Sequence, residues 1–359
     1  MTRSNNWAFL HLFTMCLFFA GGGCGGEERL DTLQITEGDD TTLDDESFAT
    51  YNNNPIECTT TISPGTSISK TITNSSTPAT ICLNPGKFNE RVIFAKSNIV
   101  LMTTPGATTR AIIDGKGKSF ANWEGLVHIS GKSNIIIDNI KIQNSKLAGI
   151  SIRDNATNIT VKRCYFLSNS WSAIKAGWSR TSNIKFNNNT ISHPPNSDPR
   201  GAGYPSQARE DISFSNVKGG EIAHNKIKSN AGGEGIDVKD DSDKISVHHN
   251  KIKNALTGIY IDAYSAGVSN IEIYNNEVTR TNTDTPRYGV GMAVGSEHGG
   301  LAENIYFHDN YVSFNNVGYQ RSTYVAPGHT QHFSNIVFKN NTGTNNNSLK
   351  NWMLSGWWQ

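Results

Sequence analysis

One short segment gathers most of the residues that could carry out chemistry. Residues 232–250 read GGEGIDVKDDSDKISVHHN and place Lys239 among acidic residues. Carboxylates beside a lysine keep its pKa high, which opposes a role as general base unless a cation neutralises them. Carboxylate oxygens are the ligands that Ca²⁺ prefers. The segment offers those of Glu234, Asp237, Asp240 and Asp241.

A bound Ca²⁺ would make lysine chemistry possible. If the carboxylate of a uronate lay against the ion, the proton α to that carboxylate would become acidic, and Lys239 could remove it. This predicts a calcium-assisted polysaccharide lyase with Tyr260 or His298 as the acid and Asp262 beside Lys239 in the catalytic group. The competing interpretation is a salt-bridged outer strand that ends in an aspartate-rich turn.

A recurring pattern indicates which elements must position these residues. A repeat start, usually Asn-Ile, recurs at spacings near 24 to 26 residues, with longer steps where loops are inserted. The starts are Asn98, Asn134, Asn158, Asn183, Lys244, Asn270, Asn304 and Asn335. Such a period is typical of solenoids. Within each repeat, inward and outward positions alternate with a period of two, and β-branched residues occupy the inward positions. This pattern favours strands. We therefore expect an all-β parallel β-helix of about ten coils over residues 55–359.

Asparagine recurs at a second position, six residues after the repeat start. The members are Asn189, Asn225, Asn250, Asn276, Asn310 and Asn341, with Cys164 in the same position one coil earlier. An inward asparagine at a tight bend can bond its neighbours above and below. We predict a structural ladder without a catalytic role, and a buried thiol at Cys164.

A second strand of each coil is expected to carry the chemistry. The outer members of its triplets are apolar and should pack inward, so the middle members should face solvent. Stacking then aligns one exterior column of Ser151, Lys175, Ser213, Asp237, Tyr260 and Gly291. The neighbouring column contains Arg153, Gly177, Ser215, Lys239, Asp262 and Ala293.

The longest inserted loops should border this exterior face. They span residues 192–211, 279–288 and 295–303, and they contribute Arg200, Arg209, Arg280, Arg287, Tyr204, Tyr288, Glu297 and His298. Loops beside a flat strand face form a groove. The four arginines and Tyr288, together with Lys175, would suit binding of an anionic polysaccharide such as a polyuronate. The alternative is that these loop arginines form no site.

The segment 232–250 resembles the catalytic coil of the lyase family that contains chondroitinase B and the β-helical alginate lyases. In that family a metal-binding glutamate precedes the base lysine by five residues, as Glu234 precedes Lys239, and an asparagine follows, as at Asn250. The next coil of the family supplies an arginine where this sequence has Asp262. The repeat pattern is similar to the wider pectate-lyase-like superfamily, which implies a right-handed parallel β-helix.

Two further functions stay open, because this solenoid hosts several. A glycoside hydrolase could use Asp237, Asp262 and Glu297, two of which must flank the bond. A non-catalytic surface protein could bind glycan through Tyr260, Tyr264 and Trp178. A metal site at His248 and His249 is not expected, because adjacent strand residues point to opposite faces.

The N-terminus predicts export. Residues 1–23 have Arg3 near the start and an apolar run before three glycines, which is typical of a signal peptide. Small residues before Cys24 resemble a lipoprotein processing site, with an ordinary cleavage site as the alternative. Residues 25–54 contain nine acidic residues and should form a solvated linker. We expect a bacterial cell-surface or periplasmic lipoprotein attached to the membrane only by its lipid.

Composition and cysteines narrow the remaining possibilities. The 359 residues carry a net charge of +1, with 36% hydrophobic residues, so a large core is possible. This charge gives no reason to propose nucleic acid as a partner, and we expect a monomer that acts on a polysaccharide. In an oxidising compartment Cys58 and Cys82 are candidates for a disulfide at the start of the domain.

Overall fold

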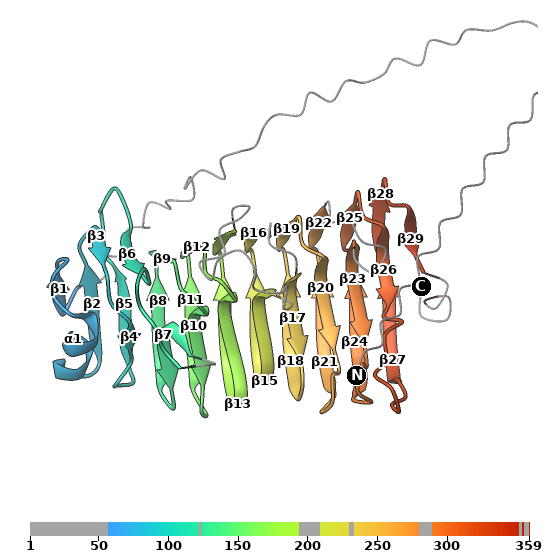
Figure 1. Cartoon of the computed structure of the whole chain (residues 1–359), viewed down its shortest axis with the longest axis horizontal. Coiled ribbons are helices and arrows are strands. Elements are labelled where there is room, and N and C mark those ends of the chain that lie inside the picture. Colours follow the sequence, from blue (N-terminus) through green and yellow to red (C-terminus); the bar gives the residue numbers. More distant parts are fainter. Residues whose placement is uncertain are drawn as a thin grey trace, which may run out of the picture. The chain divides into compact units, whose positions relative to one another are not determined.

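The computed structural model describes residues 57–121, 124–193, 209–229, 233–279, 289–351, 354 and 359. These residues belong to one compact unit and form coils stacked along one axis (Figure 1). The predicted signal peptide, Cys24 and the linker lie outside the described residues. No helix in the described part of the chain is long and apolar enough to cross a membrane.

Each complete coil contributes strands to three faces of the solenoid. One face is a separate sheet with a single strand per coil. Its strands are β3 (Gly86–Phe88), β6 (Ala111–Asp114), β9 (Ile140–Gln143), β12 (Tyr165–Leu167), β14 (Thr190–Ser192), β16 (Lys226–Lys228), β19 (Lys251–Lys253), β22 (Glu277–Thr279), β25 (Tyr311–Ser313) and β28 (Thr342–Thr344). These ten described strands confirm the prediction of about ten coils.

The other two faces are joined into one sheet, because β13 (Ser172–Asn187) and β15 (Arg209–Ala223) run through both. One face also contains β4 (Val92–Ile93), β7 (Gly125–Ser130), β10 (Ala148–Arg153), β17 (Gly233–Lys239), β20 (Thr257–Asp262), β23 (Val290–Gly295), β26 (Val317–Arg321) and β29 (Ser348–Lys350). The other contains β1 (Thr60–Ile62), β2 (Ala79–Leu83), β5 (Ile99–Thr103), β8 (Ser133–Asp138), β11 (Thr157–Lys162), β18 (Ser242–His248), β21 (Val268–Tyr274), β24 (Leu301–His308) and β27 (His332–Lys339).

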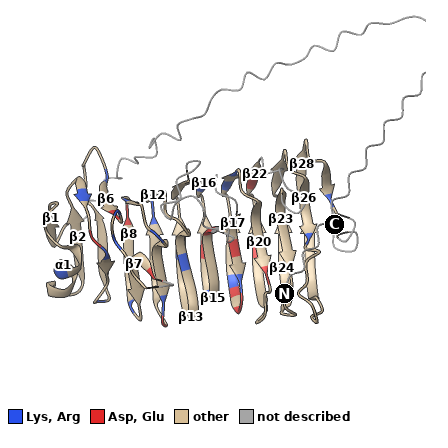
Figure 2. Ribbon diagram, viewed as in Figure 1, with Lys and Arg blue, Asp and Glu red and all other residues tan. Residues whose placement is uncertain are grey.

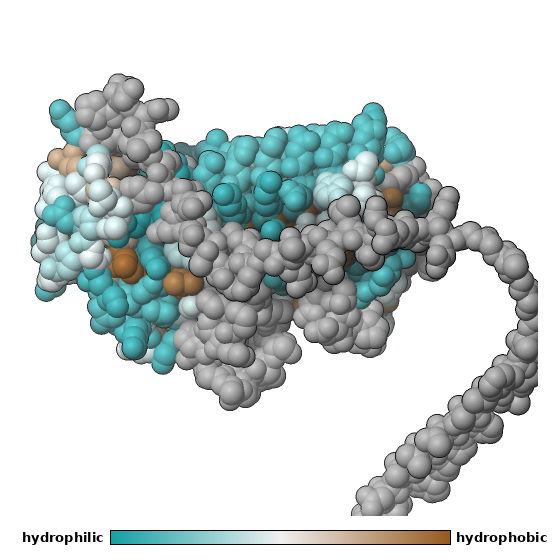
Figure 3. Space-filling view, turned by 90° about the horizontal axis from the view of Figure 1, so that it is seen from above, coloured by the Kyte–Doolittle hydropathy of each residue, from teal (hydrophilic) through white to brown (hydrophobic). Residues whose placement is uncertain are grey.

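The core is a set of apolar columns inside the coils. Ile174, Ile212, Ile236 and Ile259 lie in register on neighbouring strands and are fully buried. Burying one such side chain stabilises the fold by about 1.5–3 kcal/mol. Hydrophilic residues cover much of the described surface in the view of Figure 3. The predicted alternation of inward and outward residues is therefore confirmed.

The predicted asparagine ladder is present at one bend of the coil. The backbone N–H of Asn225 donates to Oδ1 of Asn250 at 3.0 Å, and the amide group of Asn250 donates to the carbonyl of Ile222 at 2.8 Å. The same pattern runs from Asn189 to Asn341, all buried. Cys164 donates its backbone N–H into this ladder, and burial raises the pKa of its thiol to about 12.

The register of β23 differs from the sequence prediction by two residues. Tyr260 pairs with Ala293, and Asp262 pairs with Gly295, where the sequence suggested Gly291 and Ala293. A slip of two residues preserves which side chains face inward, so alternation alone cannot detect it.

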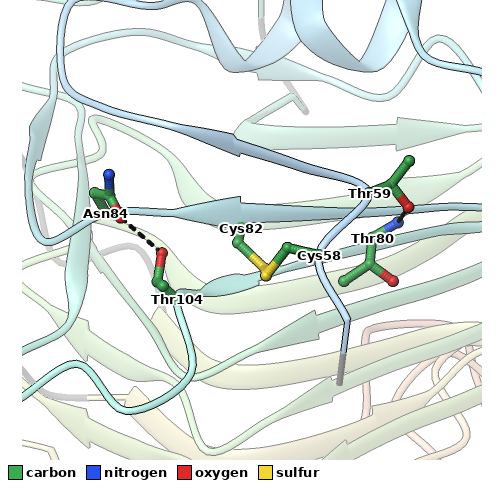
Figure 4. The surroundings of a disulfide bond; sticks show 6 residues. All are labelled: Cys58, Thr59, Thr80, Cys82, Asn84 and Thr104. Atoms are coloured by element: carbon green, nitrogen blue, oxygen red, sulfur yellow. Dashed lines mark hydrogen bonds between the residues drawn. A yellow bond between two sulfur atoms is a disulfide. The ribbon is translucent and has the colours of Figure 1, made fainter. Parts of the chain in front are cut away.

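The N-terminal coils contain a disulfide and a short helix, α1 (Ile68–Asn74). Cys58 and Cys82, the pair named from the sequence, form the disulfide, with a Cα–Cα distance of 5.7 Å (Figure 4). Close by, the backbone N–H of Thr80 donates to the hydroxyl of Thr59 at 3.0 Å. These links hold β1 against β2 at the N-terminal end of the solenoid.

Candidate active site

Charged side chains gather where β15, β17 and β20 lie side by side. Figure 2 shows acidic and basic residues close together on β17, in the middle of the solenoid. The parallel register pairs Glu210 with Glu234, Asp237 with Tyr260, and Lys239 with Asp262. We call Lys175, Glu210, Glu234, Asp237, Lys239 and Asp262 the carboxylate cluster.

Lys239 lies between two acidic side chains of the cluster. Its Nζ lies 2.6 Å from Oδ2 of Asp237 and forms a second ion pair with Glu210. Burial acts to lower the pKa of Lys239, but the two carboxylates outweigh it and hold that pKa well above its usual value. Lys239 is therefore a cation in this arrangement.

Glu210 joins Lys239 to a second lysine. Its Oε2 lies 3.4 Å from Nζ of Lys175, and both side chains are buried. Burial favours a high pKa for Glu210, but Lys239 and Lys175 overcome it and lower the pKa to about 2. Lys175 also lies 4.7 Å from the ring centre of Trp171 and 5.5 Å from that of Trp178.

Three carboxyl groups of the cluster carry buried oxygens that have no hydrogen-bond partner among the described residues: Oε2 of Glu234, Oδ1 of Asp237 and Oδ1 of Asp262. Burial, reinforced by Asp237 and Glu210, raises the pKa of Glu234 to about 8. Burial also raises the pKa of Asp237 to about 7, against the opposing effect of Lys239. Burial and the neighbouring Asp237 raise the pKa of Asp262 well above its usual value.

Tyr260 covers one side of the cluster. Its hydroxyl donates to Oε1 of Glu297 at 2.8 Å. A Cβ atom on Gly295 would lie 2.1 Å from that hydroxyl oxygen, so a glycine is needed for Tyr260 to occupy this position. Burial raises the pKa of Tyr260 well above its usual value. The sequence predicts Glu297 as a loop residue beside the exterior face and as a candidate catalytic carboxylate of a glycoside hydrolase.

The cluster residues stand on the outer face of the strands but are not solvent-exposed, which corrects the sequence prediction. Asp237 is 2% exposed, Asp262 is 5% exposed and Tyr260 is 9% exposed. Neighbouring outward side chains on successive coils are only one strand apart, about 4.8 Å. They therefore cover one another, and an outward position in the alternation does not make a residue solvated.

Two acidic residues predicted as metal ligands, Asp240 and Asp241, make contacts in the turn after β17. Oδ1 of Asp240 accepts hydrogen bonds from the backbone N–H groups of Ser265, at 3.0 Å, and Ala266, at 3.3 Å. The exposed Asp241 forms an ion pair with Lys218 at 2.9 Å. Both aspartates have positive φ, which an aspartate tolerates better than most residues. The charge of Asp240 also contributes to the raised pKa of Asp262 in the carboxylate cluster.

His298, predicted as a possible acid, lies beside other rings. Its ring centre is 4.0 Å from that of Tyr264 and 5.2 Å from that of His329. The predicted substrate-binding residues Arg200, Arg280, Arg287 and Tyr288 lie outside the described residues. Arg209 begins β15, and nothing is described of its side chain.

The net charge of the ionised cluster suits a bound cation, but its carboxylate oxygens do not converge as metal ligands. Four carboxylates face two lysines, so full ionisation would leave two negative charges without compensation. Within the described residues, however, the only group of three or more potential ligands whose atoms converge within 4.8 Å contains histidines, not these carboxylates. The acidic side chains would have to rotate towards one another to hold Ca²⁺.

Glu210 is a residue of the candidate site that the sequence does not predict. It falls within residues 192–211, which the sequence predicts as an inserted loop. In the structure it is the second residue of β15 and forms ion pairs with both lysines of the cluster. The signal that could have found it is the spacing of 24 residues from Glu210 to Glu234, which matches one coil.

The comparisons with known proteins agree with this fold. A family model described as "Right handed beta helix region" matches residues 98–278, half of the chain. The chain therefore belongs to the right-handed parallel β-helix family. No curated protein matches it at a significant level.

Solved structures of carbohydrate-active enzymes share the architecture. A polygalacturonase from Erwinia carotovora ssp. carotovora has a TM-score of 0.63 at 15% identity, covering 83% of this chain and 89% of that one. The pectate lyase Pel9A has a TM-score of 0.51 at 14% identity, with coverages of 83% and 80%. An alginate lyase from Paenibacillus sp. str. FPU-7 has a TM-score of 0.50 at 15% identity, with coverages of 77% and 98%. At these identities the likeness shows the fold alone, which both hydrolases and lyases adopt.

Proposed function

We propose that this protein cleaves a polysaccharide by hydrolysis, with Asp237 and Asp262 as the acid–base pair. The observation that carries this proposal is the register of β17 on β20. Asp237 pairs with Tyr260, so Asp262 is one strand across and two residues along. With a strand spacing of about 4.8 Å and a rise of about 3.3 Å per residue, their Cα atoms are about 8 Å apart. Side chains that leave neighbouring strands on the same face keep roughly the separation of their Cα atoms, and inverting glycosidases hold their two carboxyl groups about 6.5–9.5 Å apart.

The two aspartates differ in how strongly a neighbouring cation opposes the effect of burial: the pKa of Asp237 is raised to about 7, and that of Asp262 is raised well above its usual value. Burial and the neighbouring Asp237 keep the pKa of Asp262 high, so Asp262 holds a proton and can donate it to the departing sugar oxygen. Asp237 lies 2.6 Å from the Lys239 ammonium group, which favours its ionised form. An ionised Asp237 can accept a proton from the attacking water.

The same contacts oppose Lys239 as a base. A lysine can accept a proton only when it is neutral, and two carboxylates stabilise its charged form. In the hydrolytic proposal Lys239 is a positioning residue, because it orients Asp237 and opposes the rise in its pKa that burial causes.

An anionic polysaccharide is the proposed substrate class. In the sequence, residues 194–208, which contain Arg200, directly precede β15 of the cluster. Residues 280–288, which contain Arg280 and Arg287, precede β23, the strand that pairs with β20. Trp178, which is 51% exposed, offers a flat apolar face for a sugar ring close to Lys175. Arginine side chains suit the carboxylates of a uronate chain.

Calcium-assisted β-elimination is the second candidate. The unpartnered oxygens of Glu234 and Asp237 favour it, as does the excess of carboxyl groups over lysines in the cluster. A cation held by these two residues would neutralise the carboxylates and acidify the proton α to a uronate carboxylate. Lys239, released from Asp237, would be the base.

Export and anchoring belong to the same proposal. The apolar N-terminal segment, Cys24 and the acidic linker support a lipoprotein on the bacterial cell surface or in the periplasm, where polysaccharides are accessible. The disulfide between Cys58 and Cys82 is also consistent with an oxidising compartment.

Product analysis tests the proposal. The purified chain is incubated with polygalacturonate, alginate, chondroitin or a neutral glycan, with calcium or with a chelator. Hydrolysis predicts new reducing ends without an unsaturated product that absorbs in the ultraviolet, and activity that survives the chelator. Ultraviolet-absorbing products that require calcium would establish the second candidate instead.

A further inference from the structure

Three histidines converge away from the carboxylate cluster, at the bend that follows β15 and β18. His224, His248 and His249 each have a ring nitrogen that lies within 4.8 Å of a ring nitrogen of the other two. The two Nδ1 atoms of His248 and His249 are 2.9 Å apart. The rings of His224 and His249 are stacked, with centres 4.8 Å apart.

This arrangement corrects the prediction that His248 and His249 cannot share an ion. The prediction assumed that both residues lie in one regular strand. β18 ends at His248, and His249 has a φ of 54°. A left-handed residue breaks the alternation, so its side chain turns to the same side as that of His248.

The bend itself does not require histidine. The equivalent residues of neighbouring coils are Asn188 and Asn275, with φ values of 57° and 52°, similar to 57° at His224 and 54° at His249. Asparagine is among the residues that adopt this conformation most readily. The backbone conformation therefore does not explain why two consecutive coils carry histidine at this bend. A third histidine, His248, lies beside them on the adjoining strand.

Glu221 fixes the tautomer of the central histidine. Nε2 of His248 lies 3.2 Å from Oε1 of Glu221. An Nε2–H donated to this carboxylate leaves the lone pair of His248 on Nδ1, which is the atom that faces His249. Metal-bound histidines are commonly oriented by a carboxylate on the opposite ring nitrogen in this way.

We propose that His224, His248 and His249 form a binding site for a divalent transition-metal ion such as Zn²⁺. Three imidazoles suit zinc, copper or nickel, whereas calcium requires oxygen ligands. His224 and His249 are exposed, so their rings can rotate to equalise the distances around an ion. Solvent can then occupy a fourth coordination position, as in zinc sites with three protein ligands.

Zinc binding to the chelator-treated full chain, measured by titration calorimetry, tests this site. We expect one zinc ion per chain at the site. His224→Asn and His249→Asn should each weaken it at least about tenfold, and Glu221→Gln should weaken it by about 10- to 100-fold. The two asparagine variants should stay folded, because neighbouring coils use asparagine at this bend.

His308→Asn is the matched control. His308 stacks on Tyr274, which in turn stacks on His248, but it is not part of the converging group. This variant should bind zinc as the parent does. Absence of zinc binding by the parent, or equal binding by the His224→Asn and His249→Asn variants with circular dichroism unchanged, would overturn the proposal.

Discussion

Nζ of Lys239 lies 2.6 Å from Oδ2 of Asp237, two residues earlier on the same strand. This contact explains why a lysine tolerates a largely buried position, since its charge is matched by Asp237 and by Glu210. It also opposes a role of Lys239 as a general base, because a lysine held in its charged form cannot accept a proton.

Replacing Lys239 should reveal the ion pairs as a loss of stability. Lys239→Ala leaves two buried carboxylates without their shared cation, which typically costs about 3–5 kcal/mol. The solvent-facing position expected from the sequence would instead predict about 0.5 kcal/mol or less. Urea denaturation distinguishes the two values. Lys218→Ala is a control, because its partner Asp241 is exposed and the loss should stay within about 1 kcal/mol.

Glu234 should make the fold less stable as the pH rises. Its pKa is raised to about 8 in the folded chain, so between its ordinary pKa near 4.5 and pH 8 the folded state holds a proton that the unfolded state has lost. The free energy of unfolding therefore falls over this range. Glu234→Gln removes this contribution.

Between pH 5 and pH 9 the parent should lose about 1 kcal/mol or more of unfolding free energy relative to the Glu234→Gln variant. Comparing the two proteins cancels the titration of groups that do not interact with Glu234. A difference that stays constant with pH would contradict the raised pKa.

Gly295 and Tyr260 should behave as a coupled pair. Gly295→Ala places a Cβ where the Tyr260 hydroxyl lies, and overpacking of this kind costs about 1–3 kcal/mol. Tyr260→Phe removes the hydroxyl and creates space. In a double-mutant cycle the alanine should therefore cost less in the phenylalanine background. Additive effects would show that the two side chains do not compete for the same volume.

Cys24→Ser should release the protein from the membrane. Lipid on Cys24 is the only proposed attachment, so the variant should move from the detergent phase to the aqueous phase on Triton X-114 fractionation. Cys164→Ser offers a control, because this thiol is buried in the core and its replacement should leave the distribution unchanged. An unchanged distribution of Cys24→Ser would refute lipidation there.

Much of the fold could be predicted because its features are periodic. The spacing of Asn225 and Asn250 corresponds to one coil, and the buried amide of Asn225 donates to the coils on both sides of it. The alternation around Asp237 likewise predicted that Ile236 and Val238 are buried.

The candidate site was less predictable because its contacts are not periodic. The register of β23 brings the carbonyl oxygen of Gly291 so close to Gly258 that a Cβ there would collide with it, and alternation does not report such close packing. The role of Glu210 depends on where an insertion ends. The convergence of His248 and His249 depends on one left-handed residue.

The anomeric configuration of the first product tests the central claim most directly. The chain is given the polysaccharide that it cleaves, and proton nuclear magnetic resonance follows the new reducing end before it equilibrates. The diagonal arrangement of Asp237 and Asp262 predicts an inverted anomer, and Asp262→Asn should lower turnover by about 10²- to 10⁴-fold while keeping the fold. A retained anomer, an unsaturated product, or full activity in Asp262→Asn would contradict the account.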